Sequence, residues 1–458
     1  MANRSRTDWL RWRLRWVFEA RSAGAAVMHT LAAQFGVLGV NLATGLIIAR
    51  ELAPKGRGEQ AAMTLWPAVL ASLLSFGLPV ALRYYAARDR ARSSELLGVA
   101  LIYAALLGFV ATFAGIVFVP HWLSHYNVHV IRFTQWLMLL SPPFLVARIL
   151  QSFLEARGDF RQSNFILYMP PAGTLVTLLA LIGFHRLNPY TSSLAYVIPT
   201  VLLTVWRLIA LRRFIRFRLP DFAEATRRLF TYGFGAYGIN ILNTFAAQID
   251  QALVVKFLSP ADLGAYTVAL TIGRLPSTIA QALVVVLLPR ATAREFDAAL
   301  TLVARAARVN LVGTAVASTV LALVVPTALP FLYGHAFSIS VGVAEILLLQ
   351  VVISSTTSVL AQSFLATGRP VFLTILQALG LGTAVPFLLM LIPRFGLIGA
   401  ALALLASTLV RLAFMMVSYP LFLKRPPPSL VLRTDDIRFV RESLRGGRRA
   451  PLPQEAEI

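Results

Sequence analysis

Twelve apolar stretches alternate with charged segments along this 458-residue chain, and they limit its possible folds more than any other feature. A helix needs about 20 apolar residues to cross the hydrocarbon core of a bilayer. Stretches of this kind lie near 26–49, 61–82, 96–118, 129–154, 164–184, 190–210, 229–255, 261–288, 308–330, 340–365, 371–392 and 396–420. Charged residues make up 14% of the chain, whereas a soluble domain has about 25%. The sequence therefore predicts an all-α polytopic membrane protein with about twelve transmembrane helices.

The positive charges are distributed unevenly over the connections between these stretches. If the N-terminus is cytoplasmic, most of the 42 lysines and arginines lie in cytoplasmic segments, as expected of a membrane protein. We therefore predict that both termini are cytoplasmic and that the protein spans the bacterial cytoplasmic (inner) membrane many times. The formal net charge of +22 is then explained by topology and by contact with anionic membrane lipids, and no nucleic-acid partner is expected.

The second half of the sequence repeats blocks of the first half in the same order. LIIARELAPKGRGEQ at 46–60 aligns with ALVVKFLSPADLGAY at 252–266, and QSFL at 151–154 recurs at 362–365. The offset between matched blocks grows slowly along the chain, which indicates two six-helix halves. Because six is even, each half starts and ends on the same side of the membrane, so the repeats are predicted to be parallel.

These observations divide the chain into five predicted regions. They are a cytoplasmic amphipathic N-terminal segment (1–25), a first six-helix bundle (26–210), a basic cytoplasmic linker (211–228), a second six-helix bundle (229–422) and a basic, disordered cytoplasmic tail (423–458). The N-terminal RTDWLRWRLRW places tryptophans with apolar residues on one helical side and arginines on the other, which predicts a helix on the inner leaflet.

Repeated prolines and glycines mark equivalent positions in the two halves. Proline lacks an N–H and restricts the preceding residue, so it ends a helix, and glycine permits a close turn. We interpret six such residues as mainly architectural: Pro54, Gly58, Gly158, Pro260, Gly264 and Gly368. Within the fourth stretch, Pro142 and Pro143 predict a kink.

The pattern helix–L-x-P-x-x-x-G–helix, written LAPKGRG in the first half and LSPADLG in the second, resembles the multidrug/oligosaccharidyl-lipid/polysaccharide exporter superfamily. QSFLEARGDF and QSFLATGRPVF are similar to a step that recurs between the fourth and fifth helices of each half. The match is uneven at Glu59-Gln60, where the second half has Ala265-Tyr266. Twelve spans are most similar to the polysaccharide flippase branch.

This resemblance implies a V-shaped, two-bundle transporter that alternates between inward- and outward-open states. Its cargo would be an undecaprenyl-diphosphate-linked oligosaccharide, flipped from the inner to the outer leaflet for surface polysaccharide biosynthesis. Polysaccharide polymerase and export machinery are implied as further partners. A cation-coupled multidrug exporter of the same superfamily remains the alternative.

Charged residues inside the apolar stretches are the candidate site residues, because a charge at the membrane centre costs about 2.5–3.5 kcal/mol on insertion scales. We expect five arginines to line a cationic cavity for a diphosphate, which a guanidinium binds bidentately: Arg83, Arg148, Arg274, Arg290 and Arg411. Snorkelling to the interface and setting of topology are alternative roles. Asp250 is predicted to pair with Arg274 or to couple transport to an ion.

Several classes of chemistry lack support in the sequence. The chain has no cysteine, no metal-type histidine spacing and no G-x-x-x-x-G-K-[ST] motif for ATP. Predicted outer connections are short, and no pair of catalytic acids stands out. We therefore expect a protein that is not an enzyme, with no catalytic residues, no metal site and no cofactor.

Overall fold

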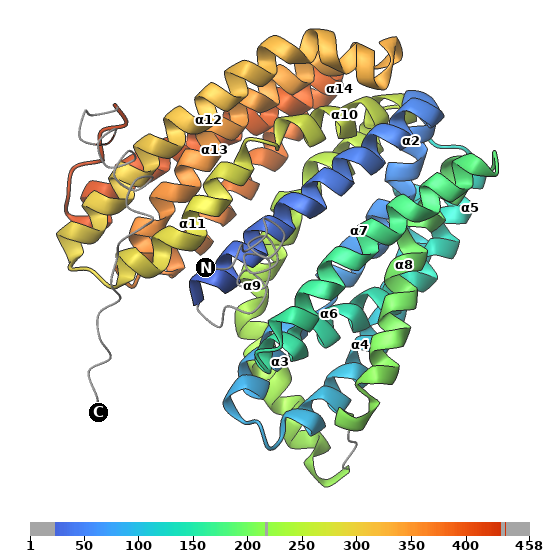
Figure 1. Ribbon diagram of the computed structural model, residues 1–458, viewed down its shortest axis with the longest axis horizontal. Coiled ribbons are helices and arrows are strands. Elements are labelled where there is room, and N and C mark those ends of the chain that lie inside the picture. The colour runs from blue at the N-terminus through green and yellow to red at the C-terminus, as the bar shows by residue number, and fades with distance from the viewer. Residues whose placement is uncertain (1–22, 216–218, 432–435, 437–458) are drawn as a thin grey trace, which may run out of the picture. The chain divides into compact units, whose positions relative to one another are not determined.

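The computed structural model describes residues 23–215, 219–431 and Asp436 (Figure 1). All regular elements within these residues are helices. The predicted N-terminal amphipathic segment lies almost entirely outside the described residues, as does most of the predicted C-terminal tail.

The helices follow the predicted apolar stretches closely. In the first half of the chain they are α2 (Ala23–Leu73), α3 (Leu78–Arg88), α4 (Ser93–Trp122), α5 (Val128–Leu137), α6 (Ser141–Ala156), α7 (Phe160–Gly183) and α8 (Pro189–Ala210). In the second half they are α9 (Leu219–Phe257), α10 (Pro260–Gly273), α11 (Ser277–Thr292), α12 (Phe296–Tyr333), α13 (Ser340–Ala366) and α14 (Val371–Ser418). Short 3₁₀ helices η1 (Met138–Leu140), η2 (Arg212–Phe214) and η3 (His335–Phe337), and a π-helical turn η4 (Tyr419–Leu423), complete the described elements.

The two longest helices, α2 and α14, each contain a break. In α2, Ala53 has φ 57° and ψ 178°, directly before Pro54. In α14, Gly396 has φ 57° and ψ −132°. Each break falls at the junction of two predicted stretches, so each of these helices covers two of them.

Three further interruptions divide predicted stretches into shorter helices. The fourth stretch has a 3₁₀ turn, η1, just before Pro142, close to the predicted kink. The second stretch is interrupted between α2 and α3, where Gly77 has φ 72°. The eighth is interrupted between α10 and α11, which meet at an angle of 47°.

Within the described residues, eight helices are long and apolar enough to cross a membrane, or up to nine if the bent pair of α10 and α11 counts as one span. α2 and α14 each count once here despite their breaks. The protein is therefore an all-helical, multi-pass membrane protein.

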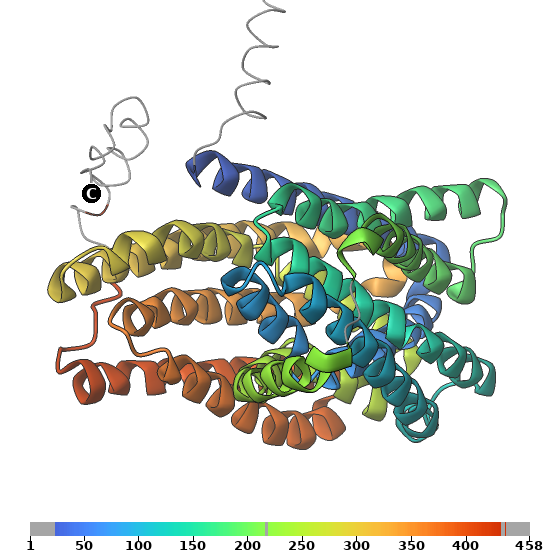
Figure 2. The same ribbon diagram turned by 90° about the horizontal axis from the view of Figure 1, so that it is seen from below.

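The chain forms two compact units. Unit 1 contains the described residues up to Ile272 together with Val325–Ala344 and Ala384–Leu404. Unit 2 contains Gly273–Val324, Glu345–Thr383 and the described residues from Leu405 onward. Within unit 1, α7 and α8 contact each other and lie side by side in both views (Figures 1 and 2).

Each unit has its own apolar core, and the repeated QSFL sequence contributes to both. Phe153 is fully buried among residues of α3, α4 and α6 in unit 1. Phe364 is fully buried among residues of α11 to α14 in unit 2, where its ring stacks on Phe372 at a centroid distance of 3.6 Å. The repeat thus places an aromatic ring at the centre of each core.

Candidate functional site

The two L-x-P-x-x-x-G motifs pack against each other in unit 1. A Cβ atom added to Gly58 would lie 1.6 Å from the carbonyl oxygen of Pro260 and 2.9 Å from the nitrogen of Gly264. A Cβ atom added to Gly264 would lie 1.9 Å from the carbonyl oxygen of Pro54 and 3.0 Å from the nitrogen of Gly58. The contact is reciprocal, so the two motifs are related by a local two-fold arrangement that leaves no room for side chains.

Nearby residues strengthen this contact between the halves of the sequence. The Trp122 Nε1–H donates a hydrogen bond of 2.7 Å to the carbonyl oxygen of Ala252, and Lys256 Nζ donates one of 2.6 Å to the carbonyl oxygen of His121. Both join the end of α4 to the last turns of α9. The end of α9 that precedes the second motif is therefore fixed to the first half.

The opposite end of α9 also contacts the first half of the chain. A Cβ atom on Gly77 would lie 2.2 Å from the carbonyl oxygen of Gly233, and the rings of Tyr84 and Tyr232 stack at a centroid distance of 4.3 Å. The Tyr237 hydroxyl donates to the carbonyl oxygen of Leu73. α9 is thus held by α2, α3 and α4 along much of its length.

Gly158 and Gly368, unlike Gly58 and Gly264, lie in open space just after the ends of helices α6 and α13. Their φ angles are 76° and 75°, and an added Cβ atom would meet nothing within 4 Å. The Asp159 N–H donates to the carbonyl oxygen of Leu154, a bond that is typical of a glycine-terminated helix. These positions therefore require glycine for backbone conformation and not for space.

Arg83 is paired with an acid. Its Nη1 lies 3.0 Å from Glu155 Oε2, and the other carboxylate oxygen accepts from Gln151 Nε2 at 3.1 Å. The second half has Ala366 where the first has Glu155, so this ion pair has no counterpart there. Arg290 lies in α11, but its side chain is outside the described residues.

Arg148 and Arg411 are the two predicted site residues whose guanidinium groups have no ion-pair partner among the described residues. Arg148 is exposed on α6 in unit 1. Arg411 lies on α14 in unit 2, where its Nε is buried without a hydrogen-bond partner. The Arg411 side chain packs on Gly380, since a Cβ atom added to Gly380 would lie 2.6 Å from Arg411 Cδ.

Hydroxyl and amide groups surround the turn of α14 that carries Arg411. Ser407 donates to the carbonyl oxygen of Gly380 at 2.8 Å, and Thr408 accepts from Gln350 Nε2 at 2.9 Å. Residues three and four apart lie on one helical face. Arg411 thus shares a polar face with Ser407 and Thr408.

Asp250 is buried in unit 1, with an exposed fraction of 1%. The hydroxyl of Tyr266, on α10, donates a hydrogen bond of 3.1 Å to Asp250 Oδ2. Arg274 is exposed in the interruption between α10 and α11 and belongs to unit 2. Pairing of Asp250 with Arg274 remains a prediction.

Two buried charged sites were not among the candidate site residues predicted from the sequence. Arg308 forms a bidentate ion pair with Asp436, at 2.6 Å from Nε and 2.9 Å from Nη2, although Asp436 falls in the predicted tail. Arg207, at the end of the predicted stretch 190–210 and not among the candidate site residues, is 3% exposed in the last turn of α8. A charge count cannot distinguish a buried arginine from a solvated one. Among the described residues, no cluster of acids or histidines could hold a metal ion.

Solved structures with a similar fold are transporters. The lipid II flippase MurJ in an inward-closed conformation matches with a TM-score of 0.72 at 14% identity, covering 90% of this chain and 90% of that one. A multidrug resistance MATE family transporter of the MOP superfamily, in an inward-facing conformation, matches with a TM-score of 0.69 at 15% identity, covering 84% and 94%. A MOP superfamily transporter from Pyrococcus furiosus gives 0.61 at 13% identity, covering 87% and 96%. The fold is therefore that of MOP-superfamily transporters.

The sequence gives a more specific assignment than the fold. Residues 24–293 match the profile of the family described as polysaccharide biosynthesis protein. Because this match covers more than half of the chain, the chain belongs to the polysaccharide biosynthesis protein family. No curated protein matches it. Family and fold together support the prediction of a membrane transport protein and not an enzyme.

Proposed function

We propose that the protein is a flippase that moves an undecaprenyl-diphosphate-linked oligosaccharide from the inner to the outer leaflet by alternating access, for surface polysaccharide biosynthesis. The observation that carries the proposal is the guanidinium of Arg411, whose buried Nε has no partner among the described residues. A cation in the hydrocarbon costs about 2.5–3.5 kcal/mol. A diphosphate that binds there would offset this cost, because a guanidinium pairs well with phosphate oxygens.

Arg148 would supply a second cation from the first half of the chain. It lacks an acidic partner within the described residues, and its side chain is exposed on α6. Arg83 is a weaker candidate for substrate binding, because Glu155 already balances its charge at 3.0 Å. Arg148 in unit 1 and Arg411 in unit 2 are therefore the two stronger candidates for binding a phosphate group.

The proposed transport cycle uses twelve membrane crossings in two parallel bundles that form a V. α2 and α14 would each cross twice, because their breaks at Ala53 and Gly396 separate two apolar segments. Alternating access requires the contacts between the halves to open at one membrane face at a time. The contacts at one end of α9 could open while the contacts at its other end stay closed.

A cation-coupled multidrug exporter is the second candidate, and one observation favours it. Asp250 is a buried acid whose Oδ2 accepts from Tyr266, and a buried carboxylate can exchange a proton or bind a cation. In the flippase proposal the same residue would couple transport to an ion. The candidates differ in cargo, so an assay of cargo distinguishes them.

The decisive experiment measures the sidedness of lipid-linked glycan in cells depleted of the protein. Undecaprenyl-diphosphate oligosaccharides would be extracted after treatment of intact spheroplasts with a glycosidase that acts on the outer face only. Depletion should cause complete, protected intermediates to accumulate. Unchanged sidedness, in a strain that makes these lipids and has no second flippase, would contradict the proposal and favour the drug exporter.

Variants test the proposed site itself. Arg148→Ala and Arg411→Ala, expressed in the depleted strain, should insert normally and fail to restore outer-face glycan. Arg394→Ala is the matched control, because Arg394 lies on the same helix as Arg411 and is exposed. Full restoration by both site variants would overturn the site assignment but not the flippase function.

A further inference from the structure

Arg207 is a buried arginine near the end of a helix that faces the lipid. It lies in the last turn of α8, and only 3% of the residue is exposed. Its guanidinium carbon lies 5.3 Å from the ring centre of Phe165 and 4.8 Å from that of Trp206. Nη1 donates to Gln162 Oε1, and Nη2 donates to the Gln162 carbonyl oxygen at 3.3 Å. The aromatic rings and the amide hold the guanidinium in place without neutralising it.

The charge of Arg207 is not matched by an ion pair within the described residues. Its Nε is buried and has no hydrogen-bond partner there. Asp159 interacts electrostatically with Arg207, but its carboxylate caps α7 by accepting from the Gln162 N–H at 3.1 Å. By contrast, buried Arg308 has a bidentate partner in Asp436. Burying a guanidinium without an anion is costly, so the site lacks one negative group.

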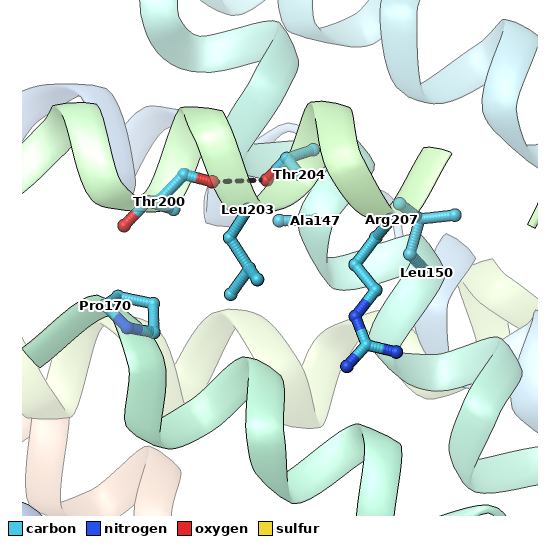
Figure 3. A pocket seen from close by; sticks show the side chains of 7 residues that line it. All are labelled: Ala147, Leu150, Pro170, Thr200, Leu203, Thr204 and Arg207. Carbon is cyan, nitrogen blue, oxygen red and sulfur yellow. Dashed lines mark hydrogen bonds between the residues drawn. The ribbon is translucent and has the colours of Figure 1, made fainter. Parts of the chain in front are cut away.

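Arg207 lines a small cavity enclosed by α6, α7 and α8 (Figure 3). The cavity has a volume of about 40 Å³, enough to hold ordered water, and Thr200 and Thr204 line it together with Arg207. In Figure 3 the guanidinium extends from α8 toward the neighbouring helix, on the side where Leu203 also projects. The guanidinium therefore lies between α8 and the helices packed beside it.

An apolar groove adjoins this cavity on the surface of unit 1. It has a volume of about 320 Å³, is lined by Phe165, Met169, Leu202 and Trp206, and shares Leu203 with the cavity. At Pro199 the groove meets a close contact of α7 with α8, where a Cβ atom on Gly173 would lie 2.8 Å from Pro199 Cβ. The groove is thus bounded by the helix contact and lies beside the arginine.

We propose that Arg207 and this groove form a binding site for an anionic phospholipid, with the phosphate at Arg207 and an acyl chain along the groove. A lipid combines the two properties that the site needs, namely one negative phosphate and a long apolar chain. Arg207 lies in the last turn of α8, next to the predicted cytoplasmic linker, which is the depth of a head group in the inner leaflet. The proposal does not depend on the cargo of the transporter.

The test is native mass spectrometry of the full-length protein after exchange into detergent with phosphatidylglycerol or with phosphatidylcholine of the same acyl chains. The wild type should retain phosphatidylglycerol about tenfold more strongly than phosphatidylcholine, as expected for a hydrogen bond between charged groups. Arg207→Gln should reduce this retention to the level of phosphatidylcholine. Arg213→Gln is the matched control and should change nothing, because Arg213 is an exposed arginine at the same end of α8.

A second variant keeps the test decisive if Arg207→Gln fails to fold. Met169→Trp fills the groove and leaves the bonds of Arg207 to Gln162 in place, so it should also lower phosphatidylglycerol retention. Equal retention of the two lipids by the wild type, or unchanged retention in the variants, would overturn the proposal. Stronger retention of undecaprenyl phosphate than of phosphatidylglycerol would also overturn it, because the occupant would then be a polyprenyl carrier.

Discussion

Gly58 and Gly264 lie against each other, each beside the proline carbonyl group of the other's motif. The distances from an added Cβ atom to that carbonyl oxygen, 1.6 Å at Gly58 and 1.9 Å at Gly264, are far below van der Waals contact. The opposing groups are backbone atoms, which cannot rotate away as a side chain can. The contact joins α2 to α10, so the two sequence repeats meet at positions that have no room for a side chain.

Alanine at Gly58 or at Gly264 should therefore disrupt the protein. Gly58→Ala must displace either the Pro260 peptide or the whole of α10, and we expect a destabilisation of more than about 3 kcal/mol, beyond the usual range for overpacking. Thermal unfolding of purified protein in detergent, with the yield of inserted protein, would measure the loss. Gly45→Ala is the control, because Gly45 lies in the same helix with nothing within 4 Å of an added Cβ atom. Equal stability of the Gly58 and Gly45 variants would refute the close contact.

Close glycine contacts can be recognised from the sequence only where the glycines belong to a repeated motif. Gly58 and Gly264 were identifiable because each motif repeats, and repetition is visible in a single sequence. Gly77 and Gly233 make an equally close contact, with 2.2 Å from an added Cβ atom to a carbonyl oxygen. They belong to no repeated block, so no sequence pattern distinguishes them from the other glycines of the chain.

Charged residues were harder to interpret than the apolar pattern. Helix positions follow from local hydrophobicity, and the helices accordingly overlap the predicted stretches. The environment of an arginine depends on which distant residues pack beside it. Arg83 meets Glu155, and Arg308 meets Asp436, across long separations in sequence. Neither pair has a local signature, and Arg207 was not recognised as a candidate site residue for the same reason.

A cross-link between Tyr84 and Tyr232 should stop transport. These rings stack at one end of the contact between α3 and α9, and alternating access requires that contact to open. The chain contains no cysteine, so Tyr84→Cys/Tyr232→Cys can be joined selectively by a short thiol-reactive cross-linker. We expect outer-face glycan to fall after cross-linking and to recover after cleavage of the linker.

The control for this experiment joins two helices of the first half. Gln135 Nε2 donates to the carbonyl oxygen of Ile116 at 2.8 Å, which places α5 beside α4. Cross-linked Ile116→Cys/Gln135→Cys should transport normally. Full activity of the cross-linked Tyr84–Tyr232 pair would mean that α3 and α9 stay together throughout the cycle.

Gly380→Ala should impair transport without preventing insertion. The new methyl group would lie 2.6 Å from Arg411 Cδ and 3.0 Å from its Nε, so it must push the guanidinium aside. A displaced guanidinium loses the geometry for bidentate binding of phosphate oxygens, and we expect at least a tenfold loss of activity, about 1.4 kcal/mol. Gly382→Ala is the control on the same helix, since nothing lies within 4 Å of an added Cβ atom there. The readout is recovery of outer-face glycan in the depleted strain.

The Arg83–Glu155 ion pair should contribute little to stability. Its side chains are 51% and 22% exposed, and exposed ion pairs are typically worth about 0–1 kcal/mol. Arg83→Gln should therefore change thermal stability only slightly, and transport should persist if Arg83 has no role in binding the substrate. If Arg83→Gln abolishes transport and the charge exchange Arg83→Glu/Glu155→Arg restores it, the ion pair is what transport requires. Loss that the exchange does not restore would assign a substrate-binding role to Arg83.

Asp436→Asn should destabilise unit 2 far more than Asp297→Asn. The Asp436 carboxylate is 1% exposed and accepts from both Nε and Nη2 of Arg308, with Arg305 Nε at 3.3 Å. Its neutralisation leaves buried Arg308 without a counter-charge, which typically costs about 3–5 kcal/mol. Asp297 makes an equally short bidentate pair with Arg425, but both side chains are more than half exposed, so water screens this pair and its loss should change stability little. Thermal unfolding of the two variants in the same detergent gives the comparison. Equal losses of thermal stability in the two variants would mean that Asp436 is solvated. The Asp436–Arg308 ion pair would then not stabilise unit 2.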